Sequence, residues 1–438
     1  MGTFLAAVLL LVSGCGLKGA SGGPETDIHI YYHADDGEFL DVRMLPLERE
    51  TEEGAKEGKI VITLAASGPI MNSETTYRRC VDQFNKENDK YYVELTEYDW
   101  GGMVGDAQIR IAVEVGSGGG PDLLTEDIFP LSQEIMDSGV LVNLTPYLEA
   151  SGITTEKYFF GYASATSGDK IYGICPNIGV VNYCVDEKVL GGREAPSDLE
   201  SLVDRLLEYP EKASFLGPTI LSRYIMAYFL EGSEDLWGMV DWEDKTCDFT
   251  DPLFSKILEV TKRYREDGKK GYDPVVHSYL VSMVSPISQC QSLYPGSVST
   301  GFYYDDGSHP KCQVSGDTLM INANTEHLEG AYAFLSYVLC KSGQSFSVEP
   351  VHKEIWEAQF QYALDAIAQG RAHFTLNEEM RQEVLKIYED ARFAPRRAET
   401  ILEIVYEEAE SYFEGDRSKE EVIGLIQNRV QLYLNENK

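Results

Sequence analysis

The pattern of apolar and polar positions predicts alternating strands and helices from residue 59 onward. Residues 60–66 form a continuous apolar run rich in β-branched side chains, typical of a strand buried on both faces. Residues 77–84 carry apolar side chains at the i, i+3, i+4 and i+7 spacing of an amphipathic helix. Residues 91–98 alternate as a second strand, and residues 106–115 repeat the helical spacing. The apolar face of this second helix is predicted at Ile109, Ala112 and Val113.

A third strand is predicted in residues 118–127, GGGPDLLTED, where Gly and Pro signal a turn into the apolar pair Leu123 and Leu124. The order strand, helix, strand, helix, strand favours parallel pairing through right-handed crossovers. Parallel pairing aligns the carboxyl ends of the strands at one edge, where open α/β sheets hold ligands. The residues expected at this edge are Ser67, Gly68, Asp99, Trp100, Thr125, Glu126 and Asp127.

The rest of the chain continues this mixed pattern. Residues 170–185 read as a strand that leaves one sheet and enters another, because the apolar run is long and is interrupted by Gly173 and Pro176. A short N-terminal hairpin is predicted at 28–32 and 39–44. Further helices are expected at 129–138, 197–209, 219–230, 252–265, 329–339 and through most of 354–436, a hairpin at 237–249, and strands at 275–284, 298–304 and 316–322.

Composition narrows the class of protein. At 438 residues the chain is long enough for two lobes rather than one core. An apolar fraction of 43% excludes global disorder. The 37 basic and 72 acidic residues give a formal charge of -35, which repels phosphate backbones, so nucleic acid is not expected as a partner.

The N-terminus carries its own signal. Residues 4–12 are an apolar run of nine, too short to span a bilayer but suited to a secretory signal. The run leads into Val12, Ser13, Gly14 and Cys15, which resembles the lipobox of bacterial lipoproteins, in which the thiol receives a lipid. Residues 16–23 then look like a flexible tether. The alternatives are a buried cysteine after a chance apolar run and, since no basic residue precedes the run, a truncated signal.

The remaining cysteines and the histidines do not predict a metal site or a cofactor. Seven cysteines besides Cys15, at irregular spacing, are not a disulfide framework, and no metal-binding spacing occurs. Cys80 lies on an apolar helix face, which favours a small buried thiol. Cys175 and Cys184 either pair across a hairpin or stay free, and the sequence decides neither.

From residue 59 onward the chain resembles the family 1 extracellular solute-binding proteins, the carbohydrate-type receptors of ABC importers. The resemblance rests on the order and spacing of several short motifs. They are Gly120-Pro121-Asp122, Ser138 to Leu141, Leu144-Thr145-Pro146-Tyr147, Lys170 to Gly173, Asn182-Tyr183, residues 186–190, Glu329 to Phe334 and residues 401–435.

This resemblance implies an α/β, two-lobed, periplasmic-binding-protein-like fold of type II. Each lobe would hold a mostly parallel sheet flanked by helices, joined by a multi-strand hinge with crossings near 171–177, 315–322 and 344–354. The expected domains are a signal peptide and lipobox at 1–15, a tether and hairpin linker at 16–58, lobe 1 at 59–173 plus 315–350, and lobe 2 at 174–314 plus 351–438. The chain departs from the family at 275–303, which lacks the usual segment leading to a tryptophan in the cleft.

Carboxylates, amides and aromatic faces are the groups that a sugar cleft needs, because they pair with hydroxyls and cover the apolar face of the ring. Glu126 and Asp127 are neighbours on an extended strand and therefore point to opposite sides, so one of them is expected to face the ligand. The alternative for Asp127 is capping a helix that starts at Phe129. The candidates on the first wall are Ser67, Gly68, Asp99, Trp100, Glu126 and Asp127, and those on the second are Asn177, Asn182, Arg223, Trp237, Tyr303 and Tyr304.

The function that follows from the resemblance is capture of a carbohydrate, an oligosaccharide, between two lobes that close around it. A monomer held at the outer face of the membrane by its lipid would deliver this solute to the permease subunits of an ABC transporter. The alternatives are a surface sensor or adhesion module without transport, and a secreted glycoside hydrolase. The hydrolase is disfavoured, because adjacent acids on opposite strand faces do not supply a carboxyl pair about 5 to 9.5 Å apart across one bond.

Overall fold

The computed structural model describes 30–32, 39–41, 56–68, 76–98, 103–159, 163–177, 179–217, 221–281, 294–304, 313–315, 318–344, 347, 349–371, 376–391 and 393–436. The chain divides into two compact units, and each is described here by itself. Unit 1 comprises Met1–Gly179, Ser282–Val284 and Ser315–Glu389, and unit 2 comprises Val180–Val281, Ser285–Val314 and Asp390–Lys438.

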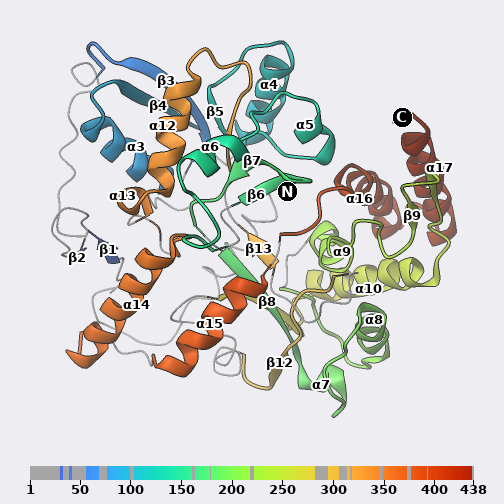
Figure 1. Cartoon of the computed structure of the whole chain (residues 1–438). Helices are drawn as coiled ribbons and strands as arrows, with labels where there is room; N and C mark the ends of the chain where they lie inside the picture. The colour runs from blue at the N-terminus through green and yellow to red at the C-terminus, as the bar shows by residue number, and fades with distance from the viewer. Residues whose placement is uncertain are drawn as a thin grey trace. The chain divides into compact units, whose positions relative to one another are not determined.

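The sheet of unit 1 contains six described strands in the order β4-β3-β5-β14-β7-β6 (Figure 1). Strand β3 pairs in parallel with β4 over its whole length and with β5 over two residues, which confirms the predicted parallel core. The other pairings are antiparallel, so the sheet is mixed. The strands are β3 (Ile60–Ser67), β4 (Tyr91–Tyr98), β5 (Leu123–Thr125), β6 (Ala163–Ser167), β7 (Lys170–Ile174) and β14 (Leu319–Ile321).

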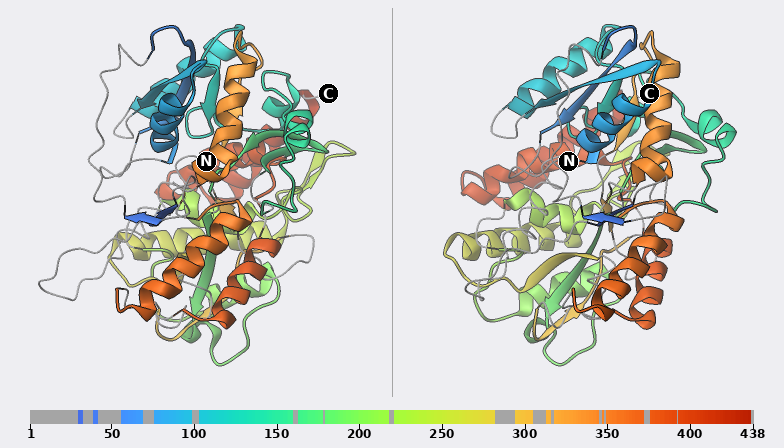
Figure 2. Two further views of the ribbon diagram at one scale, coloured as in Figure 1. Left: turned by 60° about the vertical axis from the view of Figure 1, so that its left-hand side comes forward. Right: turned by 90° about the vertical axis from the view of Figure 1, so that its left-hand side faces the viewer.

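Helices cover both faces of this sheet (Figure 2). Helix α12 (Leu328–Leu339) lies against the face that carries Ile62, and α3 (Thr76–Glu87) packs beside it. The approach of α12 requires Gly330, because a Cβ atom there would lie 2.2 Å from Cδ1 of Ile62. Helix α4 (Met103–Gly116) covers the opposite face, where Ile111 and Val115 join a buried cluster with Leu124.

The buried face of α4 differs from the one predicted. Ile109 and Val113 are 70% and 66% exposed, whereas Ile111 and Val115 are each 1% exposed. The prediction was wrong because apolar residues occupy several faces of this helix, so its periodicity alone could not select the face that packs on the sheet. Cys80, by contrast, is a buried free thiol on α3, as predicted.

The sheet of unit 2 is antiparallel in its described pairings. The central strand β8 lies between β11 and β12, and both neighbours run opposite to it. The expectation of a mostly parallel sheet in each lobe is therefore wrong for this unit, because β11 and β12 reach β8 through separate long connections and each runs against its direction. It is also wrong for unit 1, where three of the five pairings between described strands are antiparallel. The strands are β8 (Gly179–Asp186), β11 (Val276–Val281), β12 (Ser297–Ser299) and β13 (Gln313–Ser315), which also pairs with β8.

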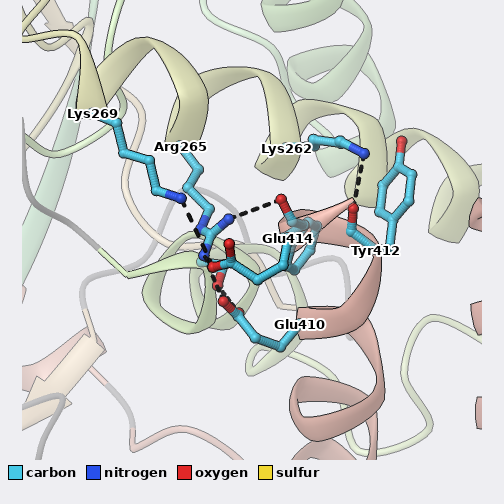
Figure 3. A network of polar contacts seen from close by, with 8 residues as sticks. Lys262, Arg265, Lys269, Glu410, Tyr412 and Glu414 are labelled. Carbon is cyan, nitrogen blue, oxygen red and sulfur yellow. Dashed lines mark hydrogen bonds and ion pairs between the residues drawn. The ribbon is translucent and has the colours of Figure 1, made fainter. Parts of the chain in front are cut away.

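The helices of unit 2 are joined by buried charge as well as by apolar packing. Arg265 on α10 (Pro252–Lys269) forms ion pairs with Glu410 and Glu414 of α16 (Glu399–Glu414) and donates a hydrogen bond of 2.9 Å to the carbonyl of Phe413 (Figure 3). The other elements are α7 (Glu187–Leu190), α8 (Leu199–Glu208), α9 (Ser222–Leu230), α17 (Lys419–Glu436) and the hairpin of β9 (Val240–Asp241) and β10 (Thr246–Cys247).

The chain crosses between the units close to two predicted places. It leaves unit 1 after Gly179, the first residue of β8, and, apart from Ser282–Val284, it returns at Ser315, the last residue of β13. The predicted third crossing at 344–354 falls inside unit 1, where the Gln344 side chain donates 2.7 Å to the carbonyl of Pro176 and accepts from the amide of His352. The chain instead passes to unit 2 after Glu389.

Unit 1 also contains a two-stranded hairpin and further helices outside the six-stranded sheet. Strands β1 and β2 pair antiparallel, which confirms the predicted hairpin. Cys175 and Cys184, whose pairing the sequence left open, are buried thiols that form no disulfide bond with each other. The remaining elements are β1 (Ile30–Tyr32), β2 (Phe39–Asp41), α5 (Gln133–Asp137), α6 (Thr145–Ala150), α13 (Lys341–Gln344), α14 (Lys353–Ala368) and α15 (Glu378–Asp390).

Candidate functional site

The carboxyl ends of β3, β4 and β5 meet at one edge of the unit 1 sheet, as the strand order predicted. Ser67 ends β3, and its neighbour Gly68 donates its backbone N–H to the carbonyl of Tyr98 at the end of β4, at 2.8 Å. The Ser67 hydroxyl donates a hydrogen bond to the carboxylate of Asp127, two residues beyond β5. These contacts hold the ends of all three strands together.

Glu126 is bound to a different strand. Its backbone N–H donates to the carbonyl of Thr318 at 2.9 Å, and its Oε2 accepts a hydrogen bond of 2.6 Å from the Thr318 hydroxyl. Thr318 immediately precedes β14, which runs antiparallel to β5. Glu126 and Asp127 therefore take their hydrogen bonds from hydroxyls on opposite neighbours of β5.

Both residues are buried, each at 8% exposure. Burial raises the pKa of Asp127 to about 6, the hydrogen bond from Ser67 opposes this rise, and the negative charge of Glu126 adds to it. Two buried carboxylates with hydroxyl partners form a strongly hydrogen-bond-accepting edge. Such an edge suits a ligand that offers hydroxyl or other neutral donors.

The conformation of the chain after β5 explains why the Asp127 carboxylate can bond to Ser67. The alternative prediction that Asp127 caps a helix starting at Phe129 is wrong, because α5 begins at Gln133 and is capped by Ser132, whose Oγ accepts from the amide of Ile135. Asp127 instead sits in a turn, and its carbonyl accepts 2.8 Å from the Gln108 side chain of α4. Its carboxylate is thus left to bond with Ser67.

Several predicted residues lie elsewhere. Asp99, Trp100 and Cys15 fall outside the described residues. Asn177, expected on the second wall, belongs to unit 1, where it forms a β-bridge with Pro350. Its role in binding stays a prediction.

The candidates near the unit 2 sheet are buried. Asn182 exchanges hydrogen bonds with the side chain of Ser299, its amide donating at 2.9 Å. Tyr303 is 1% exposed and its hydroxyl donates to the carbonyl of Pro196 at 3.0 Å. Tyr304 is 4% exposed. These contacts give all three side chains a packing role within the unit, and contact with a ligand stays a prediction.

Arg223 and Trp237 lie nearer the surface of unit 2. Arg223 forms an ion pair with Glu403 and lies over the ring of Tyr406, 5.1 Å from its centre. Trp237 is half-buried, with a backbone φ of 62°, and its indole N–H donates to the carbonyl of Phe229 at 2.9 Å. The positive φ is rare for a large residue, and the hydrogen bond to Phe229 ties the indole to the end of α9.

Sequence reasoning missed Thr318. The strand predicted at 316–322 includes it, but a threonine at the start of a buried strand carries no functional signal by itself. Its importance comes from the antiparallel pairing of β14 with β5, which places the start of one strand beside the end of the other. A polar residue at a strand start, combined with knowledge of that pairing, would have identified it.

Two kinds of feature are absent from the described ranges. No helix among them has the length and apolar composition needed to cross a bilayer. Within the same ranges, no group of three or more His, Cys, Asp or Glu side chains is placed to hold a metal ion.

Comparison with known proteins places this geometry in context. The sequence profile described as "bacterial extracellular solute-binding protein" matches residues 79–346. This match confirms the resemblance seen in the sequence. No curated protein matches the sequence.

Solved structures share the fold. The GacH receptor of Streptomyces glaucescens, studied unliganded and with acarbose, is 16% identical, with a TM-score of 0.53 over 86% of this chain and 99% of the receptor. The maltose/maltodextrin-binding domain MalE of Bdellovibrio bacteriovorus, bound to maltotriose, is 13% identical, with a TM-score of 0.53 over 86% of this chain and all of that domain. Lmo0181 of Listeria monocytogenes, in complex with cycloalternan, is 14% identical, with a TM-score of 0.55 over 86% and 99%. The shared fold is the two-lobed α/β fold of periplasmic binding proteins.

Proposed function

This chain belongs to the family of bacterial extracellular solute-binding proteins, and from that premise we propose that it captures an oligosaccharide and delivers it to an ABC transporter. The observation that carries the proposal is the polar edge of unit 1, where Ser67, Glu126 and Asp127 meet at the carboxyl ends of parallel strands. Open α/β sheets bind ligands at such edges. Binding, rather than catalysis, is the role of the matching family.

The chemistry of this edge supports a neutral, hydroxyl-rich solute. A sugar hydroxyl that leaves water must find a partner, and a carboxylate oxygen is a strong acceptor. The same carboxylates, in a chain with a formal charge of -35, disfavour an acidic sugar. The ligands named for the three solved structures, acarbose, maltotriose and cycloalternan, provide the first probes.

The remaining parts of the proposal concern where the protein acts. A lipid on Cys15 would anchor a monomer to the outer face of the membrane, beside the permease subunits. Ligand binding would shift the two lobes toward a closed state, as expected for this fold. No cofactor or metal is needed for this cycle.

Isothermal titration calorimetry against neutral, acidic and basic oligosaccharides tests the binding step. We expect micromolar binding of at least one neutral member and a loss of about 10-fold or more in Glu126→Gln. Asp244→Asn, a change of one exposed carboxylate in the β9–β10 hairpin of unit 2, is the control and should bind normally. If none of the sugars binds while peptides or polyols do, the carbohydrate assignment is refuted.

Membrane fractionation tests the anchor separately. Replacing Cys15 with Ser should move the protein from the membrane fraction to the medium, because the lipid attachment site is removed. Cys80→Ser, a change at a buried thiol, is the matched control and should leave the protein in the membrane fraction. If Cys15→Ser stays attached, the lipobox interpretation is wrong.

A further inference from the structure

Thr318 contacts two strands of unit 1 through separate atoms. Its hydroxyl donates to Oε2 of Glu126 at 2.6 Å, and its carbonyl accepts the backbone N–H of Glu126 at 2.9 Å. Its methyl group faces Gly173 of β7. Thr318 is 0% exposed, so water does not compete for these contacts. Glu126 is therefore held at both its main chain and its side chain by one residue.

Thr318 lies close in sequence to a boundary between the two units. The chain passes from unit 2 into unit 1 between Val314 and Ser315, three residues before Thr318. On its other side, Leu319 pairs with Ile174 of β7, the strand from which the chain leaves for unit 2 after Gly179. Thr318 is thus close in sequence to a boundary between the units and pairs, through its neighbour Leu319, with β7.

Gly173 explains how Thr318 fits there. A Cβ atom on residue 173 would lie 2.3 Å from Cγ2 of Thr318, closer than real Cβ atoms approach, and 3.1 Å from the Cβ of Ala165, a tight contact. Because residue 173 of β7 is a glycine, there is room for the methyl group of Thr318. This packing fixes the rotamer that aims the hydroxyl at Glu126.

We propose that Thr318 is a positioning residue that orients the Glu126 carboxylate for ligand capture. This inference rests on the proposed function, in which Glu126 contacts the solute. A carboxylate already oriented by Thr318 needs no further ordering when ligand arrives, which favours binding.

A purely structural role predicts something different. A buried threonine–carboxylate bond that only stabilises the fold would change the free energy of unfolding and leave affinity alone. Unit 1 supplies a comparison: the half-buried Thr325 donates its hydroxyl to Oδ1 of Asp122, which precedes β5 at the end opposite to Glu126. Comparing variants of Thr318 and Thr325 therefore distinguishes an effect on ligand affinity from an effect on the free energy of unfolding.

The experiment compares Thr318→Val, Thr318→Ser and the control Thr325→Val in the full chain, with maltotriose, acarbose and cycloalternan as probes in calorimetry. We expect Thr318→Val to weaken binding by about 10- to 100-fold, because a hydrogen bond to a charged group is lost. Thr318→Ser keeps the hydroxyl and should stay within about threefold of the wild type. Thr325→Val should melt at a lower temperature and bind normally.

A double-mutant cycle with Glu126→Gln adds a second readout. If Thr318 acts through Glu126, the losses in affinity for Thr318→Val and Glu126→Gln should not add in the double variant. Should Thr318→Val fail to fold, Thr318→Ala removes the same hydroxyl without adding a second methyl group and carries the same expectation.

The outcomes separate the two proposals. If the wild type binds a probe and Thr318→Val binds equally well, the inference is overturned and the proposed function stands. The same holds if Thr325→Val weakens binding as much as Thr318→Val, or if the losses in the cycle add. If the wild type binds no oligosaccharide at all, the proposed function fails, and the inference that rests on it fails with it.

Discussion

The Ser67 hydroxyl donates a hydrogen bond to the Asp127 carboxylate across 60 residues of sequence. The bond joins the carboxyl ends of β3 and β5 and is buried, with Ser67 at 7% and Asp127 at 8% exposure. Burial disfavours the charged form of the carboxyl, whereas the hydroxyl favours it. The protonation of Asp127 is therefore linked to folding at the place where ligand binding is proposed.

We predict that Asp127→Asn flattens the pH dependence of stability. The folded protein keeps the Asp127 proton up to about pH 6, whereas an unfolded aspartate releases it near pH 4. Ionisation therefore favours unfolding as the pH rises through this window, by up to about 3 kcal/mol. Urea unfolding at pH 4.5 and 7.5 measures the effect, and the difference between the two values cancels any constant cost of the amide.

Ser67→Ala is the companion to that test. Removing the hydroxyl removes the contact that lowers the Asp127 pKa, so this pKa should rise further and the loss of stability between pH 4.5 and 7.5 should grow. The two variants are thus expected to change the slope in opposite directions. Equal slopes in both variants and the wild type would show that Asp127 does not titrate in this window.

A second prediction concerns the charge cluster of unit 2 (Figure 3). Arg265→Met should destabilise the protein by about 2 to 4 kcal/mol, because the arginine side chain is 8% exposed and its loss leaves Glu410, Glu414 and the Phe413 carbonyl without that donor. Lys269→Met is the control: Lys269 is half-exposed and 3.8 Å from Glu414, so its loss should cost less than about 0.5 kcal/mol. Thermal unfolding distinguishes them, and equal costs would contradict the prediction.

A third prediction follows from two glutamines, Gln427 and Gln431, four residues apart on α17. The Gln427 amide donates to the carbonyl of Cys247 at 2.6 Å and accepts from the amide of Phe249 at 2.8 Å. Gln431 likewise donates to the carbonyl of Lys245 at 2.8 Å. One face of the helix therefore supplies the backbone partners that a neighbouring strand would give to β10.

Because both backbone partners of Gln427 are lost together, Gln427→Leu should cost about 1 to 3 kcal/mol. Asn428→Ala, one residue along on the exposed face, should stay within about 0.5 kcal/mol. Hydrogen exchange adds a local readout: the amide of Phe249 should lose protection in Gln427→Leu only. Unchanged protection there would mean that the glutamine does not hold the hairpin.

How far the sequence could predict this protein depends on the range of the contacts involved. The parallel strands β3, β4 and β5 were predictable because short crossovers fix their pairing. The switch of sheets within 170–185 was also visible, as an apolar run broken by Gly173 and Pro176. The antiparallel sheet around β8 was not, because β11 and β12 reach it through long connections that leave no local pattern.

The candidate site divides in the same way. Ser67, Glu126 and Asp127 were predicted together because each lies at, or within two residues beyond, the carboxyl end of a strand of the parallel core. Thr318 escaped notice because its partner Glu126 is 192 residues away and the pairing of β14 with β5 is antiparallel. Tyr303 looked like a strand-end ligand, yet its hydroxyl bonds to Pro196, a partner that only the tertiary structure reveals.

The last prediction contrasts two glycines of unit 2 with opposite surroundings. A Cβ atom on Gly232 would lie 1.6 Å from the backbone oxygen of Tyr303, so Gly232→Ala must displace main chain and should cost more than about 3 kcal/mol. Gly424 lies within α17 with nothing within 4 Å of its would-be Cβ, so Gly424→Ala should gain about 0.5 to 1 kcal/mol of helix propensity. Urea unfolding of both variants measures these changes. The opposite signs exclude a general sensitivity of unit 2 to added methyl groups, and wild-type stability in Gly232→Ala would disprove the close approach of Tyr303.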